Sequence, residues 1–530
     1  MTPTFPLSLA LGWARVVCVF VVDVGLLAAG GAVGGRSGWC VGAGTAVLIT
    51  LAALVSWRGA PVLTLAWRSL VAGRATIGVP AGALADHDRT FGAGPVGIRA
   101  VGPHLVAVVA VDGQPHSPSA LDYPRVITPS ILPLAAVAAG LRQFDVTLDG
   151  IDVVSVGARC ASKAHHPYAD TYCSEVGDHP AVGQRQTWLV IRLNAGESAR
   201  AIVWRESVSA TMSAAAEWLA QELTSLRIPA RVLTTAQIRD ADEALLAGVD
   251  PATLRPGWAR VRHPGGYVHT YWMSPRDISS DTLDRLWTPD TEATVLTVQL
   301  RLTATGATTV GVVVRYHTGA PLLEAPLTGL NPLTGRHDVG MTAGLLVAAG
   351  VPVVPARELS ADERVVVAIG ATGIIIGTTA SGHALLVDVG NPTEMATVTV
   401  AGELALTVQI ALRAAATGYQ VLVCTERPQR WKEATGAGLQ VVGEAGLAQQ
   451  LAPARRRWMV VYDKVSGPIP QGAAVMVRTV AAGLPITADV HIEQDGRNTA
   501  VIRTWAIQSR LRIDVEHERR LTGSGPGLAA

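Results

Sequence analysis

Two acidic residues separated by one position, Asp240 and Asp242, form a DxD pattern, the type that holds a divalent cation on a sugar nucleotide. Binding a metal diphosphate requires both carboxylates to converge on one ion. The sequence around them predicts a helix over residues 235–247, and residues two positions apart on a helix point in different directions. The pattern therefore favours a solvated helix face over a metal site.

A second group combines cysteines and histidines within twenty residues. Its members are Cys160, His165, His166, Cys173 and His179. Zinc could use four such side chains. The spacing matches no known finger or ribbon, and the segment has the composition of a loop, so we expect a polar surface loop. A zinc site and a Cys–His catalytic pair are the two alternatives, although no catalytic motif surrounds either cysteine.

The nucleotide-binding motifs are missing from the sequence. It contains no GxxxxGK[ST] and no Gly-Lys pair, and GxSxG and HExxH are absent too. Residues 92–97 match GxGxxG, but a dinucleotide site needs a strand before the glycines and a helix after them. Here strands follow, so we expect a turn. A helix predicted over 403–417 follows a strand and Gly402, which indicates an NTPase-like shape without nucleotide binding.

Two apolar runs at the amino end are each long enough to cross a membrane. The spans cover about residues 14–35 and 37–57 and are joined near Arg36, and Asp23 is the one acidic residue inside them. A helix of about 20 residues crosses the hydrocarbon core. The pattern predicts a transmembrane hairpin over residues 1–57. A cleaved signal peptide is the competing interpretation of the first run, but a second run follows at once.

The flanking charges predict the orientation of this hairpin. Arg15 lies at the very start of the first span, and Arg58 and Arg68 are among several arginines that follow the second, whereas Arg36 stands alone in the turn. Basic residues stay on the cytoplasmic side. We therefore expect a multi-pass protein of the cell inner (plasma) membrane with both termini in the cytoplasm. Five cysteines are too few for a disulfide-stapled outer domain.

Tryptophan–arginine pairs mark the exit from the membrane. Trp57 and Arg58 are followed ten residues later by Trp67 and Arg68. Indole and guanidinium groups anchor helices at the headgroup level, so we expect a juxtamembrane helix over 61–72; a simple linker helix is the alternative. An ionisable group inside a span usually faces a protein neighbour, so Asp23 is expected to make an assembly contact.

The remainder is expected to form a cytosolic α/β region with mixed sheets. The net charge of +1, from 43 basic and 42 acidic residues, argues against a general nucleic-acid-binding surface. Two later apolar runs, 340–356 and 365–382, are expected to be a helix plus a strand and two buried strands. Helices are predicted over 208–226, 235–247 and 403–417. The predicted segments are a basic juxtamembrane helix and linker (58–89), a first part (90–290), a second part (291–516) and a disordered tail (517–530).

This layout resembles the EccE family of the actinobacterial type VII (ESX) secretion machine. The likeness is carried by residues 186–193 (QTWLVIRL), by the helix around 210–223, and by residues 409–414 (QIALRA) running on to 424–431 (CTERPQRW). The resemblance implies a non-catalytic structural subunit, without cofactor or metal, that supports the inner-membrane core complex and protein export. Its implied partners are EccB, the ATPase EccC, EccD and the protease MycP.

The resemblance also implies a degenerate glycosyltransferase-like fold for the cytosolic region. A membrane-tethered glycosyltransferase-like enzyme is therefore the main alternative, and it requires a pocket with converging carboxylates. A solitary membrane sensor or adaptor is a third hypothesis, and it requires a protein that is stable alone in detergent.

Overall fold

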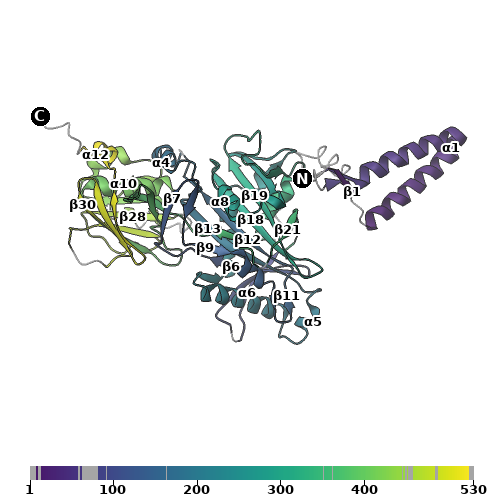
Figure 1. Cartoon of the computed structure of the whole chain (residues 1–530), viewed down its shortest axis with the longest axis horizontal. Coiled ribbons are helices and arrows are strands. Elements are labelled where there is room, and N and C mark those ends of the chain that lie inside the picture. Colours follow the sequence, from purple (N-terminus) through teal and green to yellow (C-terminus); the bar gives the residue numbers. More distant parts are fainter. Residues whose placement is uncertain are drawn as a thin grey trace. The chain divides into compact units, whose positions relative to one another are not determined.

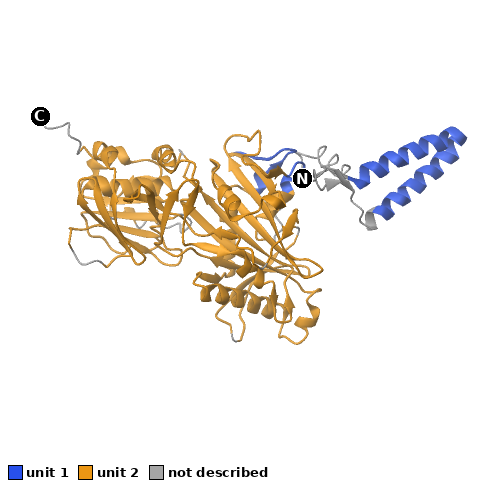
Figure 2. Cartoon of the chain, in the orientation of Figure 1, with its two compact units in different colours: residues 1–78, 251–264, 333–338 blue, residues 79–250, 265–332, 339–530 orange. Residues whose placement is uncertain are grey.

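The computed structural model describes residues 7–9, 13–57, 60–61, 82–90, 92–162, 164–349, 351–360, 362–443, 446–447, 450–451, 457–483 and 487–523. The chain divides into two compact units (Figure 2). The first contains residues 1–78, 251–264 and 333–338. The second contains residues 79–250, 265–332 and 339–530.

The first unit contains the long apolar helix α1 (Trp13–Leu54). Its stretch Val16–Leu54 is long and apolar enough to cross a membrane. Gly35 interrupts the helix with φ 55° and ψ −133°, a conformation that glycine adopts readily because it has no Cβ. The helix stops at Leu54, three residues before the predicted end of the second span. The residues that follow form strand β2 (Val55–Trp57), which pairs with β1 (Leu7–Leu9) and β3 (Ala60–Pro61).

The second unit is built on two sheets. The first sheet is antiparallel and runs in the order β17-β19-β18-β12-β13-β6-β5-β4. Its strands are β4 (Ala83–His87), β5 (Val96–Val101), β6 (His104–Val111), β12 (Gly150–Ala158), β13 (Gln184–Asn194), β17 (Gly266–Met273), β18 (Ala293–Leu302) and β19 (Thr308–Thr318). Strands on both sides of residue 290 therefore share one sheet, so the predicted first part (90–290) and second part (291–516) both contribute strands to it.

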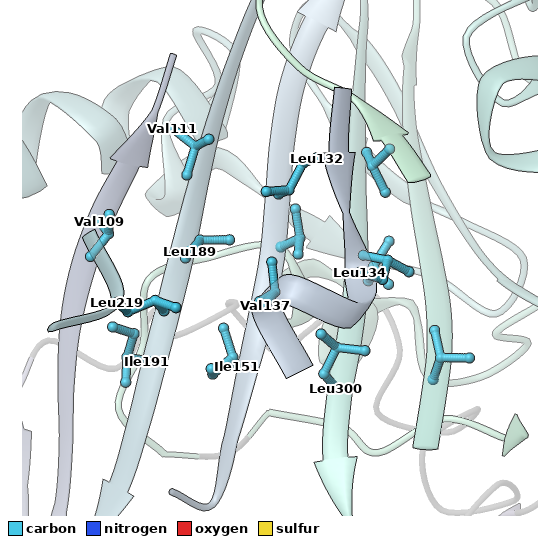
Figure 3. Close-up of a cluster of buried hydrophobic side chains, with 14 of the residues drawn as sticks. Val109, Val111, Leu132, Leu134, Val137, Ile151, Leu189, Ile191, Leu219 and Leu300 are labelled. Carbon is cyan, nitrogen blue, oxygen red and sulfur yellow. The ribbon is translucent and has the colours of Figure 1, made fainter. Parts of the chain in front are cut away.

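Side chains of the central strands alternate between two hydrophobic layers, as the period of a strand requires. In β13, Leu189 and Ile191 face one layer, whereas Trp188 and Val190 face the other. On the first face lie helices α3 (Leu134–Ala139) and α6 (Val208–Ser225), as the cluster in Figure 3 shows. On the other face lies α7 (Thr235–Leu246). Helices thus cover both faces of the sheet.

The helices begin where their capping residues predict. The hydroxyl of Ser207 accepts a hydrogen bond from the amide of Ala210 at the start of α6. Thr234 and Gln237 form a reciprocal capping box at the start of α7. The helices predicted over 208–226 and 235–247 are confirmed. Each begins at the predicted residue and ends one residue earlier than predicted.

The second sheet combines a parallel half with an antiparallel half. The parallel half has the order β27-β26-β28-β29-β25-β30, and the antiparallel half continues β30-β31-β32-β23-β24-β7-β8. The parallel half comprises β25 (Ala396–Ala401), β26 (Gln420–Thr425), β27 (Leu439–Val441), β28 (Trp458–Asp463), β29 (Val475–Thr479) and β30 (Val490–Gly496). The antiparallel half adds β7 (Pro118–Asp122), β8 (Arg125–Ile127), β23 (Ile374–Thr378), β24 (Ala384–Val387), β31 (Thr499–Thr504) and β32 (Gln508–Arg512).

Helix α10 (Leu404–Ala416) connects β25 to β26, and all of its residues are buried. Parallel strands need such a crossover. The helix predicted over 403–417 is confirmed, and Gly418 follows it at φ 98°, the left-handed conformation that commonly ends a helix. Helices α4 (Tyr168–Val176) and α12 (Glu516–Leu521) pack against α10 (Figure 1). The tail expected from residue 517 therefore begins as a helix, because Glu518 and Arg519 are buried there.

The two later apolar runs form short strands and a helix, and β22 (Val366–Ala368) pairs with β9 (Ile131–Pro133) in a separate two-stranded sheet. Residues 365–382 form β22 and β23, as predicted. Residues 340–356 follow the prediction at their ends only, with α9 (His337–Ala343) and β21 (Ala356–Glu358). The described residues between these ends belong to no helix or strand. Arginines of the first sheet satisfy carbonyl groups of this stretch: Arg99 donates to Leu346 and Arg192 to Val347. An apolar stretch can lack regular structure when side chains replace its backbone partners.

Candidate membrane anchor and polar clusters

The two arms of α1, before and after Gly35, touch through glycines. A Cβ added to Gly30 would lie 2.5 Å from the carbonyl oxygen of Gly38, and one added to Gly42 would lie 2.9 Å from that of Leu26. Figure 1 shows the arms lying side by side. Small residues let helix backbones approach closely in a membrane, where helix association depends on packing. The glycines of this run thus have a packing role that the sequence analysis did not identify.

Asp23 has a partner within its own helix pair. The hydroxyl of Thr50 donates a hydrogen bond of 2.6 Å to Asp23 Oδ2 across 27 residues of sequence. Asp23 Oδ1 is buried, and no described residue gives it a hydrogen bond. One carboxylate oxygen therefore joins the arms. The expected assembly contact of Asp23 stays a prediction.

The other predicted anchoring residues are only partly described. Arg36 is exposed and follows the bend at Gly35. Arg15 lies in α1 and Trp57 in β2, but their side chains lie outside the described residues. Arg58, Trp67 and Arg68 lie outside the described residues altogether. The prediction that these residues anchor the chain at the headgroups therefore stays a prediction.

The DxD pair lies on helix α7, as predicted, and its two carboxylates have different surroundings. Asp240 is exposed. Asp242 Oδ2 lies 2.5 Å from Arg99 Nη2, and the Arg99 side chain is largely buried. Asp242 therefore compensates a buried cation of the sheet instead of converging with Asp240 on an ion.

The cysteine and histidine group is tied to the protein's own backbone. The imidazoles pair with carbonyl oxygens: His165 Nε2 lies 2.9 Å from that of Tyr419, and His166 Nε2 lies 3.1 Å from that of Ala434. His179 Nδ1 lies 2.7 Å from that of Val176. Among the described residues no group of three or more histidine, cysteine or acidic side chains could hold a metal ion.

The expectation of a surface loop around these residues is wrong for Cys173, which lies on helix α4. That helix forms because Tyr168, Tyr172 and Val176 pack into the core around α10. The Cys160 and Cys173 thiols hydrogen-bond to each other. This hydrogen bond lowers the pKa of Cys173 to about 7, despite partial burial, and it raises the pKa of Cys160.

The GxGxxG match is a turn that leads into β5, as predicted. Its Ala93 amide donates a 3.0 Å hydrogen bond to Glu217 Oε1, and Arg89 forms an ion pair with the same carboxylate. Gly97 is required because an added Cβ would lie 2.6 Å from the amide nitrogen of Thr235. The turn, α6 and β14 (Ala230–Val232) line a pocket of about 670 Å³.

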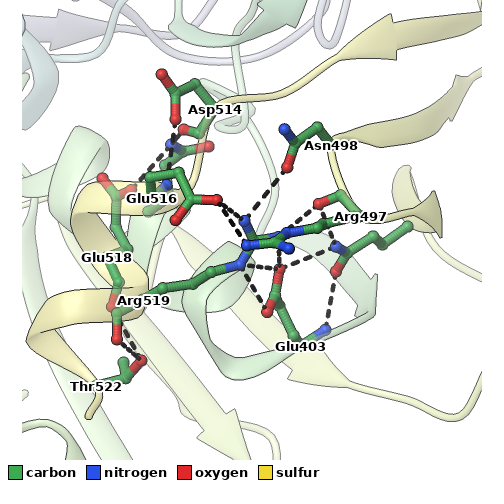
Figure 4. Close-up of polar contacts among 10 residues, drawn as sticks. Glu403, Arg497, Asn498, Asp514, Glu516, Glu518, Arg519 and Thr522 are labelled. Carbon is green, nitrogen blue, oxygen red and sulfur yellow. Dashed lines mark hydrogen bonds and ion pairs between the residues drawn. The ribbon is translucent and has the colours of Figure 1, made fainter. Parts of the chain in front are cut away.

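The position that resembles a phosphate loop is filled by the protein itself. Strand β25 ends at Ala401 and α10 begins at Leu404, so only Gly402 and Glu403 connect them. The Glu403 carboxylate accepts hydrogen bonds from Arg519 of α12, at 2.6 Å, and from Gln494 Nε2, at 2.9 Å (Figure 4). Glu403 is the N-cap residue of α10 but its side chain makes no capping hydrogen bond, so its carboxylate serves the contact with α12 and β30.

Comparisons with known proteins identify the family of this chain. The family profile described as "Putative type VII ESX secretion system translocon, EccE" matches residues 181–273, from β13 through α6 and α7 to β17. The ESX-5 secretion system protein EccE5 of Mycobacterium tuberculosis (strain H37Rv) is 36% identical over 387 residues, which are 68% of this chain and 95% of that protein. EccE5 of Mycobacterium marinum is 36% identical over 69% of this chain and 96% of its own length.

A more distant relative covers more of the chain. The ESX-2 secretion system protein EccE2 of Mycobacterium tuberculosis (strain CDC 1551) is 28% identical over 81% of this chain and 77% of its own. The chain is thus a component of a type VII (ESX) secretion system, and its long apolar helix is consistent with membrane association. It belongs to the EccE family.

Proposed function

We propose that this chain is a non-catalytic structural subunit that anchors in the cell inner membrane and stabilises the core of the ESX complex for protein export. The observation that carries the proposal is that one helix among the described residues is long and apolar enough to cross a membrane, and it bends back on itself at Gly35. Its arms touch at Gly30 and Gly38 and share the hydrogen bond between Thr50 and Asp23.

In this proposal each arm of α1 crosses the bilayer, so the chain is a multi-pass protein. Arg36 at the bend lies outside, and both termini lie in the cytoplasm, in agreement with the arginines that flank the spans. A reporter that is active only outside the membrane, fused after Ala530, should stay silent. The same reporter inserted beside Arg36 should be active; a signal from the carboxyl-terminal fusion would contradict the topology.

The proposed neighbours are EccB, the ATPase EccC, EccD and the protease MycP, as the family resemblance implies. Membership of an ESX secretion system supports the existence of protein partners. Extraction in mild detergent followed by a native gel tests the proposal. The chain should migrate in a particle far larger than its own 55.2 kDa, together with these four proteins. Migration as a monomer or dimer would contradict it.

The non-catalytic part of the proposal is supported by how the polar clusters are used. Asp242 pairs with Arg99, and Glu403 pairs with Arg519. These are internal contacts that give stability, and they leave the carboxylates engaged with arginine instead of a substrate. We further propose that the second unit has a degenerate glycosyltransferase-like fold. In this proposal a juxtamembrane segment (58–89) is followed by two parts, 90–290 and 291–516, of one cytosolic α/β region. Limited proteolysis should cut first within 58–89 if that segment is a linker.

A further inference from the structure

Three large apolar side chains of the second unit project into solvent from two neighbouring segments. Phe144 is 95% exposed, Trp204 is 90% exposed and Val203 is 68% exposed. Phe144 lies in the turn between β10 (Arg142–Gln143) and β11 (Val146–Thr147). Val203 and Trp204 follow the short helix α5 (Ala199–Ile202). We call these three residues the aromatic corner.

The two segments of the aromatic corner are joined by an ion pair. Arg205 binds both carboxylate oxygens of Asp145, and its Nη1 lies 3.0 Å from Asp145 Oδ2. Arg205 also donates to the carbonyl of Ala201. A bidentate arginine–carboxylate pair fixes geometry as well as charge. Since Asp145 follows Phe144 and Arg205 follows Trp204, the ion pair holds the backbone beside each aromatic residue.

A second bond joins the segments a few residues away. The hydroxyl of Ser198, just before α5, donates a 3.1 Å hydrogen bond to the carbonyl of Thr147 in β11. Figure 1 shows α5 and β11 next to each other at the edge of this unit. The two segments that carry the aromatic corner are therefore held together by an ion pair and a hydrogen bond.

Phe144 has a backbone conformation that is unfavourable for a phenylalanine. Phe144 has φ 56°, a left-handed value that tight hairpin turns usually assign to Gly, Asn or Asp. A phenylalanine there strains the backbone and gains almost no burial within the described unit. Residues that break a local rule without a local gain are expected at functional sites. Contact with a partner would supply the burial that the turn lacks.

The charges around the aromatic corner distinguish a protein partner from a lipid surface. Residues 142–147 and 197–206 contain three basic side chains and three acidic ones. They are Arg142, Arg200 and Arg205, and Asp145, Glu197 and Glu206. Binding to anionic lipid relies on an excess of lysine and arginine, and this surface has none. Exposed tryptophan and arginine are the residues that dominate protein interfaces.

We propose that Phe144, Val203 and Trp204 form a docking surface that inserts into an apolar cleft of a different protein subunit of the secretion complex. The proposal rests on the proposed function, since it requires a multi-subunit particle. The partner surface must be concave and apolar, to bury an indole and a phenyl ring, and must carry no strong charge, because the rim of the aromatic corner is balanced.

The test uses the full chain, co-expressed with the rest of its secretion system. The double variant Phe144→Ser with Trp204→Ser is compared with the control Leu323→Ser, which removes a side chain that is also 90% exposed. In mild detergent the double variant should melt like the parent protein, while its share in the large particle falls at least about tenfold. The control should keep its full share.

A photo-crosslinking residue placed at position 204 identifies the occupant. It should give one adduct with a different protein of the purified particle, and the same residue at position 323 should give none. Adducts with lipid, adducts with a second copy of this chain, or a double variant that stays in the particle would each overturn the docking surface. If the parent protein itself migrates alone, the proposed function fails as well. If the parent is in the particle and the double variant remains there, only this inference fails.

Discussion

Arg519 binds both carboxylate oxygens of Glu403, across 116 residues of sequence. The distances are 3.1 Å from Nε to each oxygen and 2.6 Å from Nη2 to Oε1. The pair joins the last described helix, α12, to the first turn of α10, and Gln494 completes the cluster (Figure 4). The carboxyl-terminal helix therefore closes the edge of the parallel sheet where ligands of α/β proteins usually bind.

Replacing Glu403 with Gln should destabilise the second unit modestly. Burial raises the pKa of Glu403, but hydrogen bonds from Arg519 and Gln494 outweigh it and hold the pKa below the ordinary value of 4.5. A lowered folded-state pKa means that the stabilisation is complete above pH 4.5 and is lost as the pH falls through the folded value. Because Glu403 is about one-third exposed, we expect a loss of about 1 kcal/mol at pH 7.

Thermal melting in detergent measures this loss. The variant should melt about 2–4 °C below the parent at pH 7, and the difference should shrink below pH 4. Glu433→Gln, at an exposed position, is the control and should melt like the parent. A difference that grows on acidification would show that the ion pair does not stabilise the fold.

The bend in α1 gives a second prediction, which concerns glycine. Gly38→Val should separate the arms, because its Cβ would collide with the Gly30 carbonyl. Gly44→Val is the matched control, since a Cβ at Gly44 meets nothing within 4 Å. Spin labels at Val21 and Leu51, which are exposed on opposite arms, should report a broadened, longer distance for the first variant only. Equal distances in both variants would mean that the glycine contact does not hold the arms together.

The parts of the structure that the sequence predicted are those set by local periodicity. The apolar run at the amino end predicted a long apolar helix, which the structure has as α1, and the segment that ends before Gly418 predicted α10. Ser207, one of two serines that could cap the predicted helix over 208–226, is its N-cap in the structure. The order of strands in the two sheets was not predictable. For example, β7 and β8 lie between β6 and β12 in sequence, but they pair in the second sheet and not in the first. Such pairing depends on long-range contacts that no local pattern records.

The candidate sites were harder to predict than the helices, because their partners are remote in sequence. Asp23 stood out as an acid in an apolar run, but Thr50 is an ordinary residue of a span and gave no signal. The charge partner of Asp242 is Arg99, 143 residues away. The aromatic corner was missed since Phe144 and Trp204 look like core residues in the sequence, and only their exposure identifies them.

Cys173 should be the more reactive thiol of its pair at neutral pH. The hydrogen bond from Cys160 lowers the pKa of Cys173 to about 7, with Arg159 contributing in the same direction. Alkylation requires the thiolate. The rate at Cys173 should therefore be half-maximal near pH 7 and level off about one pH unit higher, as followed by mass spectrometry of the peptide that contains Cys173. Buried Cys424 is an internal reference that should react slowly throughout.

Removing Cys160 tests the cause of this reactivity. In Cys160→Ala the midpoint of the rate profile should move up toward 9.0, the ordinary value for a thiol, because the hydrogen-bond donor is gone. A midpoint that stays near 7 would assign the acidity of Cys173 to Arg159 instead.

Single substitutions of Asp240 and Asp242 distinguish a structural role of the DxD pair from a metal site, because the two roles predict different responses. Two metal ligands act together, so losing either one should cost similar amounts of function. Here Asp242 neutralises the largely buried Arg99, and Asp240 is exposed. Asp242→Ala leaves an uncompensated cation, which should cost about 2–3 kcal/mol of stability and part of the protein level. Asp240→Ala should stay within about 0.5 kcal/mol of the parent.

The measurement pairs thermal melting with export of ESX substrates in cells that carry each variant. Asp240→Ala should secrete at the parent level, and any defect of Asp242→Ala should follow its lowered protein level. Asp242→Asn removes the charge but keeps the shape, so it should resemble Asp242→Ala in stability. If Asp240→Ala abolished export while the protein stayed stable and abundant, the exposed carboxylate would have a chemical role, and the enzyme hypothesis would replace the structural one.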